Sequence, residues 1–141
     1  LYLDYDITCF KSFEFLHYAY DFYAGMEDFW SSCYCCNAVI GARIGHPIIQ
    51  TCIKNIKCYE NKKPDLQNWP YRNQAEKEKY TTLITTGPKM FTQSIWHATD
   101  QKGNVDIIFP PEIFYPQKPT SVSFCRHNFH SLWHGNLFEN F

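Results

Sequence analysis

The stretch LYLDYD at residues 1–6 joins a β-prone apolar run to two aspartates, Asp4 and Asp6, that stand one residue apart. We expect a buried strand that ends on this carboxylate pair, because open α/β sheets bind ligands at the carboxyl ends of their strands. Two carboxylates are hard oxygen ligands that suit Mg²⁺ or Mn²⁺, and such an ion commonly holds a diphosphate. The alternative for so short a motif is a turn with two solvated acids.

Segments of strand and helix character alternate along the rest of the chain. The apolar run at residues 35–42 predicts a second buried strand, and the Gly45-His46-Pro47 break after it predicts a helix start. Apolar residues then recur at helical spacing, namely Ile48, Ile49, Cys52, Ile53 and Ile56. Residues 105–109 predict a third strand and residues 113–116 a fourth. This alternation favours an α/β architecture.

Shorter elements are expected between these segments. Residues 7–9 are interpreted as a turn, residues 11–20 as a short helix and residues 22–25 as an extended segment. Thr86-Gly87-Pro88 predicts another helix start with Thr86 as the N-cap, and the helix continues to Ala98. Its candidate core residues are Met90, Phe91, Ile95 and Trp96.

The composition is that of one globular domain. A chain of 141 residues with 45% hydrophobic content can bury a core of its own. The aromatic content of 18% is high, and aromatic side chains either pack cores or stack on sugar rings. A net charge of −1 argues against a nucleic-acid binder that relies on a basic surface.

Seven cysteines are many for this length, but their spacing does not complete a zinc site. Residues 33–36 contain one C-x-x-C pair, and no second pair follows. We therefore expect reduced thiols, with Cys52 as a small buried hydrophobe in its helical stripe. Cysteines without a pairing pattern favour a reducing compartment such as the cytoplasm, with the Golgi or secretory lumen as the alternative.

Four motifs stand in an order that matches a known family. They are Asp4-x-Asp6, the strand containing Asn37 with its Gly45-His46-Pro47 break, Thr86-Gly87-Pro88, and the histidine-rich segment 127–135. Together they resemble glycosyltransferase family 32, the sugar-transferase family with the DXD motif. That family includes α-mannosyltransferases, inositol phosphoceramide mannosyltransferases and capsular polysaccharide enzymes. The resemblance covers nearly the whole chain.

The resemblance implies a GT-A-type, Rossmann-like fold. Residues 1–141 would form a single partial catalytic domain, the C-terminal portion that starts at the DXD strand, and a nucleotide-binding half would precede it. Because Leu1 already lies inside an apolar run, we expect a segment of a longer protein. The sequence has no apolar run long enough to cross a bilayer, so membrane association would depend on a segment upstream.

The resemblance also implies a metal and nucleotide site. Asp6 would chelate Mn²⁺ or Mg²⁺ directly, and Asp4 would bind the ion through water or hold the hydroxyls of the donor. His127 would be a further metal ligand or phosphate contact. Ser131 and Trp133 would donate hydrogen bonds to a phosphate oxygen.

Other polar residues are expected at the sugar and acceptor sites. Asn37 and the loop at Gly87 would contact the donor sugar or the acceptor. Glu27 and Asp28 would orient the acceptor hydroxyl, with a solvated loop as the alternative. His46 is interpreted as a helix-start residue and not a catalytic one.

The resemblance implies a retaining, metal-dependent glycosyltransferase. It would move a hexose from a nucleotide-diphosphate sugar to a glycan or glycolipid acceptor, with GDP-mannose favoured over a UDP-hexose as donor. Leu132 separates Ser131 from Trp133, a spacing shared with the large glucosylating toxins, so both donors stay open. A glycoside hydrolase that uses Glu27 and an aspartate, and a non-catalytic carbohydrate-binding module, are the alternatives.

Overall fold

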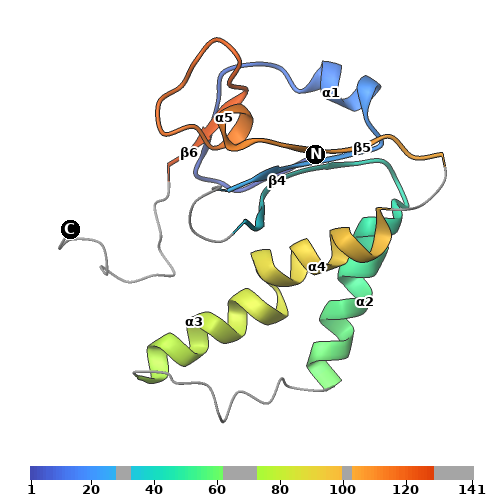
Figure 1. Cartoon of the computed structure of the whole chain (residues 1–141), viewed down its shortest axis with the longest axis vertical. Coiled ribbons are helices and arrows are strands. Elements are labelled where there is room, and N and C mark those ends of the chain that lie inside the picture. Colours follow the sequence, from blue (N-terminus) through green and yellow to red (C-terminus); the bar gives the residue numbers. More distant parts are fainter. Residues whose placement is uncertain (28–32, 62–72, 100–102, 129–141) are drawn as a thin grey trace.

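The computed structural model describes residues 1–27, 33–61, 73–99 and 103–128. These residues form a mixed α/β structure around a four-stranded sheet with the order β1-β4-β3-β5 (Figure 1). The strands are β1 Tyr2–Leu3, β3 Phe22–Met26, β4 Cys35–Ala42 and β5 Asp106–Phe109. β4 pairs antiparallel with β1 and β3, and β5 pairs parallel with β3. The α/β class expected from the sequence is therefore confirmed.

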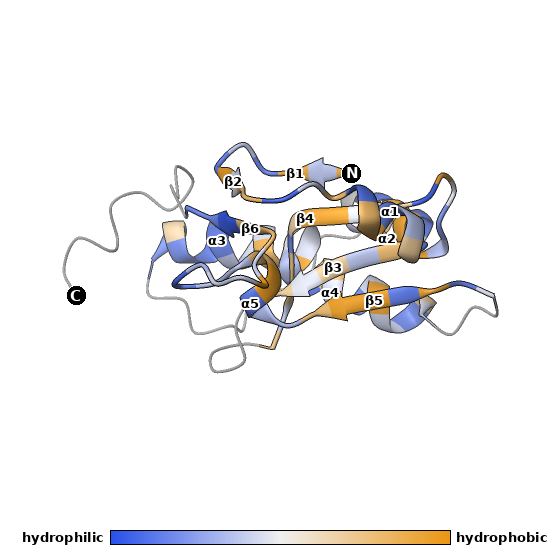
Figure 2. Ribbon diagram, turned by 90° about the horizontal axis from the view of Figure 1, so that it is seen from above, coloured by the Kyte–Doolittle hydropathy of each residue, from blue (hydrophilic) through white to orange (hydrophobic). Residues whose placement is uncertain are grey.

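Helices cover both faces of this sheet. On one face lie α2 Pro47–Asn61 and α4 Pro88–Ala98, with α3 Gln74–Thr85 packed against both (Figure 1). On the other face lie α1 Glu14–Ala19, α5 Pro111–Phe114 and a two-stranded sheet of β2 Ile7–Cys9 with β6 Cys125–His127. β4 and β5 in the middle layer are largely hydrophobic, as Figure 2 shows. The two inner strands, β3 and β4, are therefore largely buried on both faces.

The central strand β3 supplies both cores. Successive side chains of a strand point to opposite faces. Phe22 and Ala24 belong to the core under α2 and α4, whereas Tyr23 belongs to the core under α1 and α5. Tyr23 lies opposite Gly41 of β4, where an added Cβ would lie 2.0 Å from the tyrosine ring. Glycine is therefore required at position 41 by the close approach of this ring.

His46 starts α2, as the sequence predicts. Its Nδ1 accepts a hydrogen bond of 3.3 Å from the N–H of Ile48, so Nε2 is the nitrogen that donates to Asp106 at 3.0 Å. The imidazole is fully buried and stacks on Phe22. This contact joins the start of the helix to the start of β5.

The long elements agree with the sequence. β4, α2 and α4 follow the predicted segments, the strand predicted at residues 105–109 is β5, and Cys52 is buried in its helical stripe. Within the part of the chain that the structure describes, none of the helices is long and apolar enough to cross a membrane.

Three strand predictions were wrong. β1 is a two-residue edge strand whose Tyr2 is 55% exposed, because only β4 flanks it. Residues 7–9, expected as a turn, are β2, because β6 pairs with them. Of residues 113–116, expected as a strand, the first two are the end of α5, which begins at Pro111, a residue suited to the first turn of a helix.

Two predictions about α4 were also wrong. Thr86 ends α3 as its C-cap, and Gly87 is the N-cap of α4. Trp96 is 77% exposed, because the buried stripe of the helix runs through Phe91, Ile95 and Ala98 and position 96 points away from it.

Candidate metal centre

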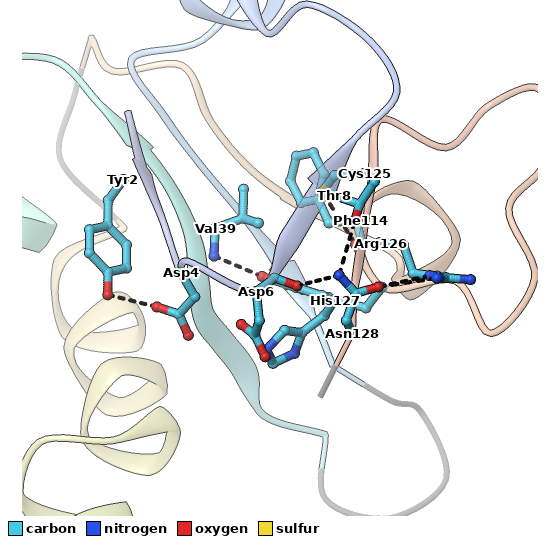
Figure 3. A network of polar contacts seen from close by, with 11 residues as sticks. Tyr2, Asp4, Asp6, Thr8, Val39, Phe114, Cys125, Arg126, His127 and Asn128 are labelled. Carbon is cyan, nitrogen blue, oxygen red and sulfur yellow. Dashed lines mark hydrogen bonds and ion pairs between the residues drawn. The ribbon is translucent and has the colours of Figure 1, made fainter. Parts of the chain in front are cut away.

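Asp4, Asp6 and His127 meet in space. One possible ligand atom from each residue lies within 4.8 Å of the others. Nε2 of His127 is 3.1 Å from Oδ1 of Asp6, and the two side chains point toward one another in Figure 3. Across residues 1–27, 33–61, 73–99 and 103–128, no other group of three or more His, Cys, Asp or Glu side chains has this geometry. The structure thus brings together the three residues that the sequence predicts as metal ligands.

A tight turn positions the two carboxylates. The N–H of Asp4 donates to the carbonyl of Ala38 at 2.9 Å, which anchors the acidic segment to β4. The N–H of Ile7 donates to the carbonyl of Asp4 at 3.1 Å, the hydrogen bond of a β-turn. This turn separates β1 from β2 and brings both aspartates to one side of the chain.

The pairing of β2 with β6 positions the histidine. Ile7 lies opposite His127 in this ladder, so the imidazole arrives beside Asp6. Asn128 strengthens the connection: its backbone N–H and its Nδ2 both donate to the carbonyl of Asp6, at 3.0 and 2.8 Å. Nδ2 also lies 2.9 Å from Oγ1 of Thr8. The sequence analysis missed Asn128, although it adjoins the predicted ligand.

Tyr2 holds the other carboxylate. Its hydroxyl donates a 2.6 Å hydrogen bond to Oδ1 of Asp4, seen at the edge of β1 in Figure 3. This bond, with burial and the charge of Asp4, raises the pKa of Tyr2 to about 12. Groups that bond to a metal ligand orient it, and Tyr2 takes this role for Asp4. The sequence analysis missed this contact, although the two residues are only two positions apart.

Burial and charge favour a cation at this place. Asp6 is 9% exposed, and Asp4 and His127 are partly buried. A carboxylate taken out of water is costly unless it is paired, and two neighbouring carboxylates repel one another. A divalent ion between the three side chains would relieve both costs.

Glu27 lies at the same end of the sheet. It directly follows β3, and its N–H donates to the carbonyl of Tyr34 at 3.1 Å. Burial first, and then the charges of Glu27 and Asp4, raise the pKa of the Cys36 thiol to about 12. Because β1 and β3 both pair with β4 and Met26 lies opposite Cys35, Glu27 is at the end of the sheet where Asp4 leaves β1.

Of the remaining predicted site residues, Asn37 and Gly87 lie in the described part of the chain and three others do not. Asn37 is partly buried in β4, next to the Ala38 carbonyl that binds Asp4. Gly87 packs where α3 meets α4, and an added Cβ would lie 2.9 Å from the backbone of Leu83, so this glycine has a packing role. Substrate contacts by Asn37 and Gly87 stay predictions. Three further residues are outside the described part of the chain, namely Asp28, Ser131 and Trp133.

Comparison of the chain with protein-family models, with curated proteins and with solved structures gives no significant match. The resemblance to glycosyltransferase family 32 therefore rests on the sequence motifs alone. The candidate metal centre rests on a different observation, the meeting of two side chains from the turn between β1 and β2 with one from β6.

Proposed function

We propose that this chain is part of a metal-dependent, retaining glycosyltransferase, and that Asp4, Asp6 and His127 hold its divalent cation. The observation that carries the proposal is the convergence of these residues within 4.8 Å, although 121 residues separate Asp6 from His127. Two carboxylates and an imidazole form a mixed oxygen and nitrogen donor set. Mg²⁺ is bound almost entirely by oxygen, whereas Mn²⁺ tolerates the nitrogen, so Mn²⁺ is the favoured ion.

Each side chain of the centre has a defined task in this proposal. Asp4, Asp6 and His127 would hold the ion, which would supply Lewis-acid stabilisation of the charge on the departing nucleoside diphosphate. Asp6, which directly precedes β2, and His127 of β6 would supply ligands that the β2–β6 ladder keeps adjacent. Tyr2 keeps the Asp4 carboxylate oriented.

The substrates proposed are those that the sequence motifs imply. The donor is GDP-mannose, with a UDP-hexose as the alternative, and the acceptor is a glycan or a glycolipid. Glu27 supports an acceptor site beside the metal, because it follows β3 at the end of the sheet where Asp4 leaves β1. The mixed sheet is compatible with a GT-A-type fold, which we propose as the finer architecture.

Calorimetric titration of Mn²⁺, followed by GDP and UDP, tests this function. Asp6→Asn removes one charge and keeps the shape of the side chain, so we expect Mn²⁺ binding to fall below detection while the circular dichroism spectrum is unchanged. Glu14→Gln is the matched control, since Glu14 is an exposed acid on α1. We expect it to bind as the parent chain does.

The outcomes separate the competing functions. Mn²⁺-dependent binding of one nucleotide identifies the donor class. Equal Mn²⁺ affinity in Asp6→Asn and Glu14→Gln contradicts the metal centre. Sugar binding without metal or nucleotide favours the carbohydrate-binding module, and metal-independent cleavage of a glycoside favours the hydrolase.

A further inference from the structure

Cys9 and Cys125 lie directly opposite one another in the β2–β6 ladder. The next pair along the ladder is joined by a hydrogen bond of 2.8 Å from the N–H of Phe10 to the carbonyl of Phe124. Because hydrogen-bonded and non-hydrogen-bonded pairs alternate between antiparallel strands, the two cysteines occupy a non-hydrogen-bonded position. Opposite Cα atoms at such a position lie about 4.5 Å apart, within the roughly 4.4–6.8 Å that disulfides span.

The two thiols share a face of the ladder but differ in access to solvent. Cys125 is completely buried, and its Sγ donates to the carbonyl of Phe114 at 3.3 Å. Cys9 is exposed. A reagent in solution can therefore react with Cys9, whereas the buried Cys125 thiol is accessible only from the neighbouring Cys9 sulfur. Among the residues that the structure describes, this pair is not part of a group of metal-ligating side chains.

We propose that Cys9 and Cys125 are a reversible oxidation site that forms a disulfide by exchange with a small-molecule disulfide such as oxidised glutathione. The Cys9 thiolate attacks one glutathione sulfur, forms a mixed disulfide and expels a glutathione thiolate. The Cys125 thiol, which is buried, then attacks the Cys9 sulfur, passes its proton to the departing glutathione and expels it as the second glutathione. Two protein thiols are oxidised, and one oxidised glutathione is reduced to two glutathiones.

The position of the pair gives the disulfide a consequence for the metal centre, and this consequence rests on the function proposed above. Cys9 lies on β2, which begins directly after Asp6. Cys125 lies on β6 together with His127. A covalent bond between the strands would keep the two ligands adjacent. The oxidation itself requires no metal, so the two proposals can fail separately.

The test is treatment of the full chain with oxidised glutathione, digestion in acid and peptide mass spectrometry. We expect a peptide that joins Cys9 to Cys125, lighter by two hydrogen atoms than the separate thiols, and restored to them by dithiothreitol. Cys58 is exposed and should retain glutathione, which shows that the reagent acted. Glutathione retained on Cys9, or a bond from Cys9 to a different cysteine, would overturn the proposal.

Cys9→Ser is the matched control, since an exposed thiol can be replaced without disturbing the core. We expect it to show no bond to Cys125 after the same treatment. Mn²⁺ titration of the oxidised and reduced parent chain distinguishes the two proposals. A disulfide that forms while neither state binds Mn²⁺ would leave the oxidation site standing and remove the metal centre.

Discussion

Nε2 of His127 lies 3.1 Å from Oδ1 of Asp6, although the two residues are 121 positions apart in the chain. The contact exists because Ile7, the residue after Asp6, pairs with His127 in the β2–β6 ladder. The imidazole is the one nitrogen donor in a group whose other members are carboxylates. His127 should therefore decide which cation the centre prefers.

Replacing His127 by aspartate tests this choice of cation. His127→Asp creates an all-oxygen donor set, so we expect Mn²⁺ affinity to fall relative to Mg²⁺ by about tenfold or more, the usual scale of changes around a metal site. Competition calorimetry with the two ions measures the ratio. His97→Gln is the control, because His97 is exposed on α4, and its ratio should equal that of the parent chain. An unchanged ratio in His127→Asp would remove the histidine from the ligand set.

Removal of the Tyr2 hydroxyl tests the orientation of Asp4. Tyr2→Phe deletes the 2.6 Å hydrogen bond, and we expect Mn²⁺ affinity to fall by about tenfold, the lower end for a group that orients a ligand, because Tyr2 is half exposed. The melting temperature should stay the same. Tyr18→Phe, at an 84% exposed position of α1, should leave both quantities unchanged. Equal affinities in the two variants would show that Asp4 needs no orienting partner.

The buried thiols predict a loss of stability in alkali. Burial raises the pKa of Cys36 and of Cys125 from 9.0 to about 12. The folded state therefore favours the neutral thiols, so their contribution is complete below pH 9 and is lost as the pH rises to about 12. The free energy of unfolding should decline by at most about 1.4 kcal/mol per pH unit for each thiol.

Urea unfolding at several pH values between 9 and 12 measures this decline. Burial also raises the pKa of Tyr23 from 10.0 to about 12, which adds to the decline above pH 10. A Cys36→Ala variant should decline less steeply than the parent chain, since one of the raised groups is gone. A parallel decline of the two proteins would contradict the assignment to Cys36.

Gly41→Ala tests the contact between the two central strands. The new methyl group would overlap the Tyr23 ring, which is 1% exposed and has no room to move, so we expect a loss of about 3 kcal/mol in the free energy of unfolding. Urea denaturation gives this value. In a Tyr23→Leu background the same glycine substitution should cost less, because the smaller side chain leaves space. An equal cost in both backgrounds would assign the effect to the backbone.

The sequence predicted the elements whose local pattern is long. Fifteen residues of α2 and eight of β4 carry enough apolar repeats to define type and limits. It failed for β2 and α5, which have three and four residues. So few residues span barely one period and do not repeat it, and β2 is a strand only because β6 lies beside it.

In the candidate site, too, the sequence predicted what local motifs carry and missed a contact that depends on strand pairing. Asp4, Asp6 and His127 were found by their chemical type and their place in the motifs. Asn128 was not, because its contact depends on the register of β6 with β2, and the local contact of Tyr2 with Asp4 was overlooked. Asn128 reaches the Asp6 carbonyl only once β6 is aligned with β2. Such alignment is a property of the tertiary structure and leaves little trace in the local sequence.

The pairing of residues 7–9 with residues 125–127 also has a consequence for the order of folding. Contacts between distant segments form slowly, because a long loop must close before they gain any energy. At a synthesis rate of about 5–20 residues per second, β6 leaves the ribosome several seconds after β2, so the two strands can pair only then. A cation that binds only when β2 and β6 are paired would then stabilise the folded state and not the partly folded states that precede it. Ion binding would therefore be a late step of folding.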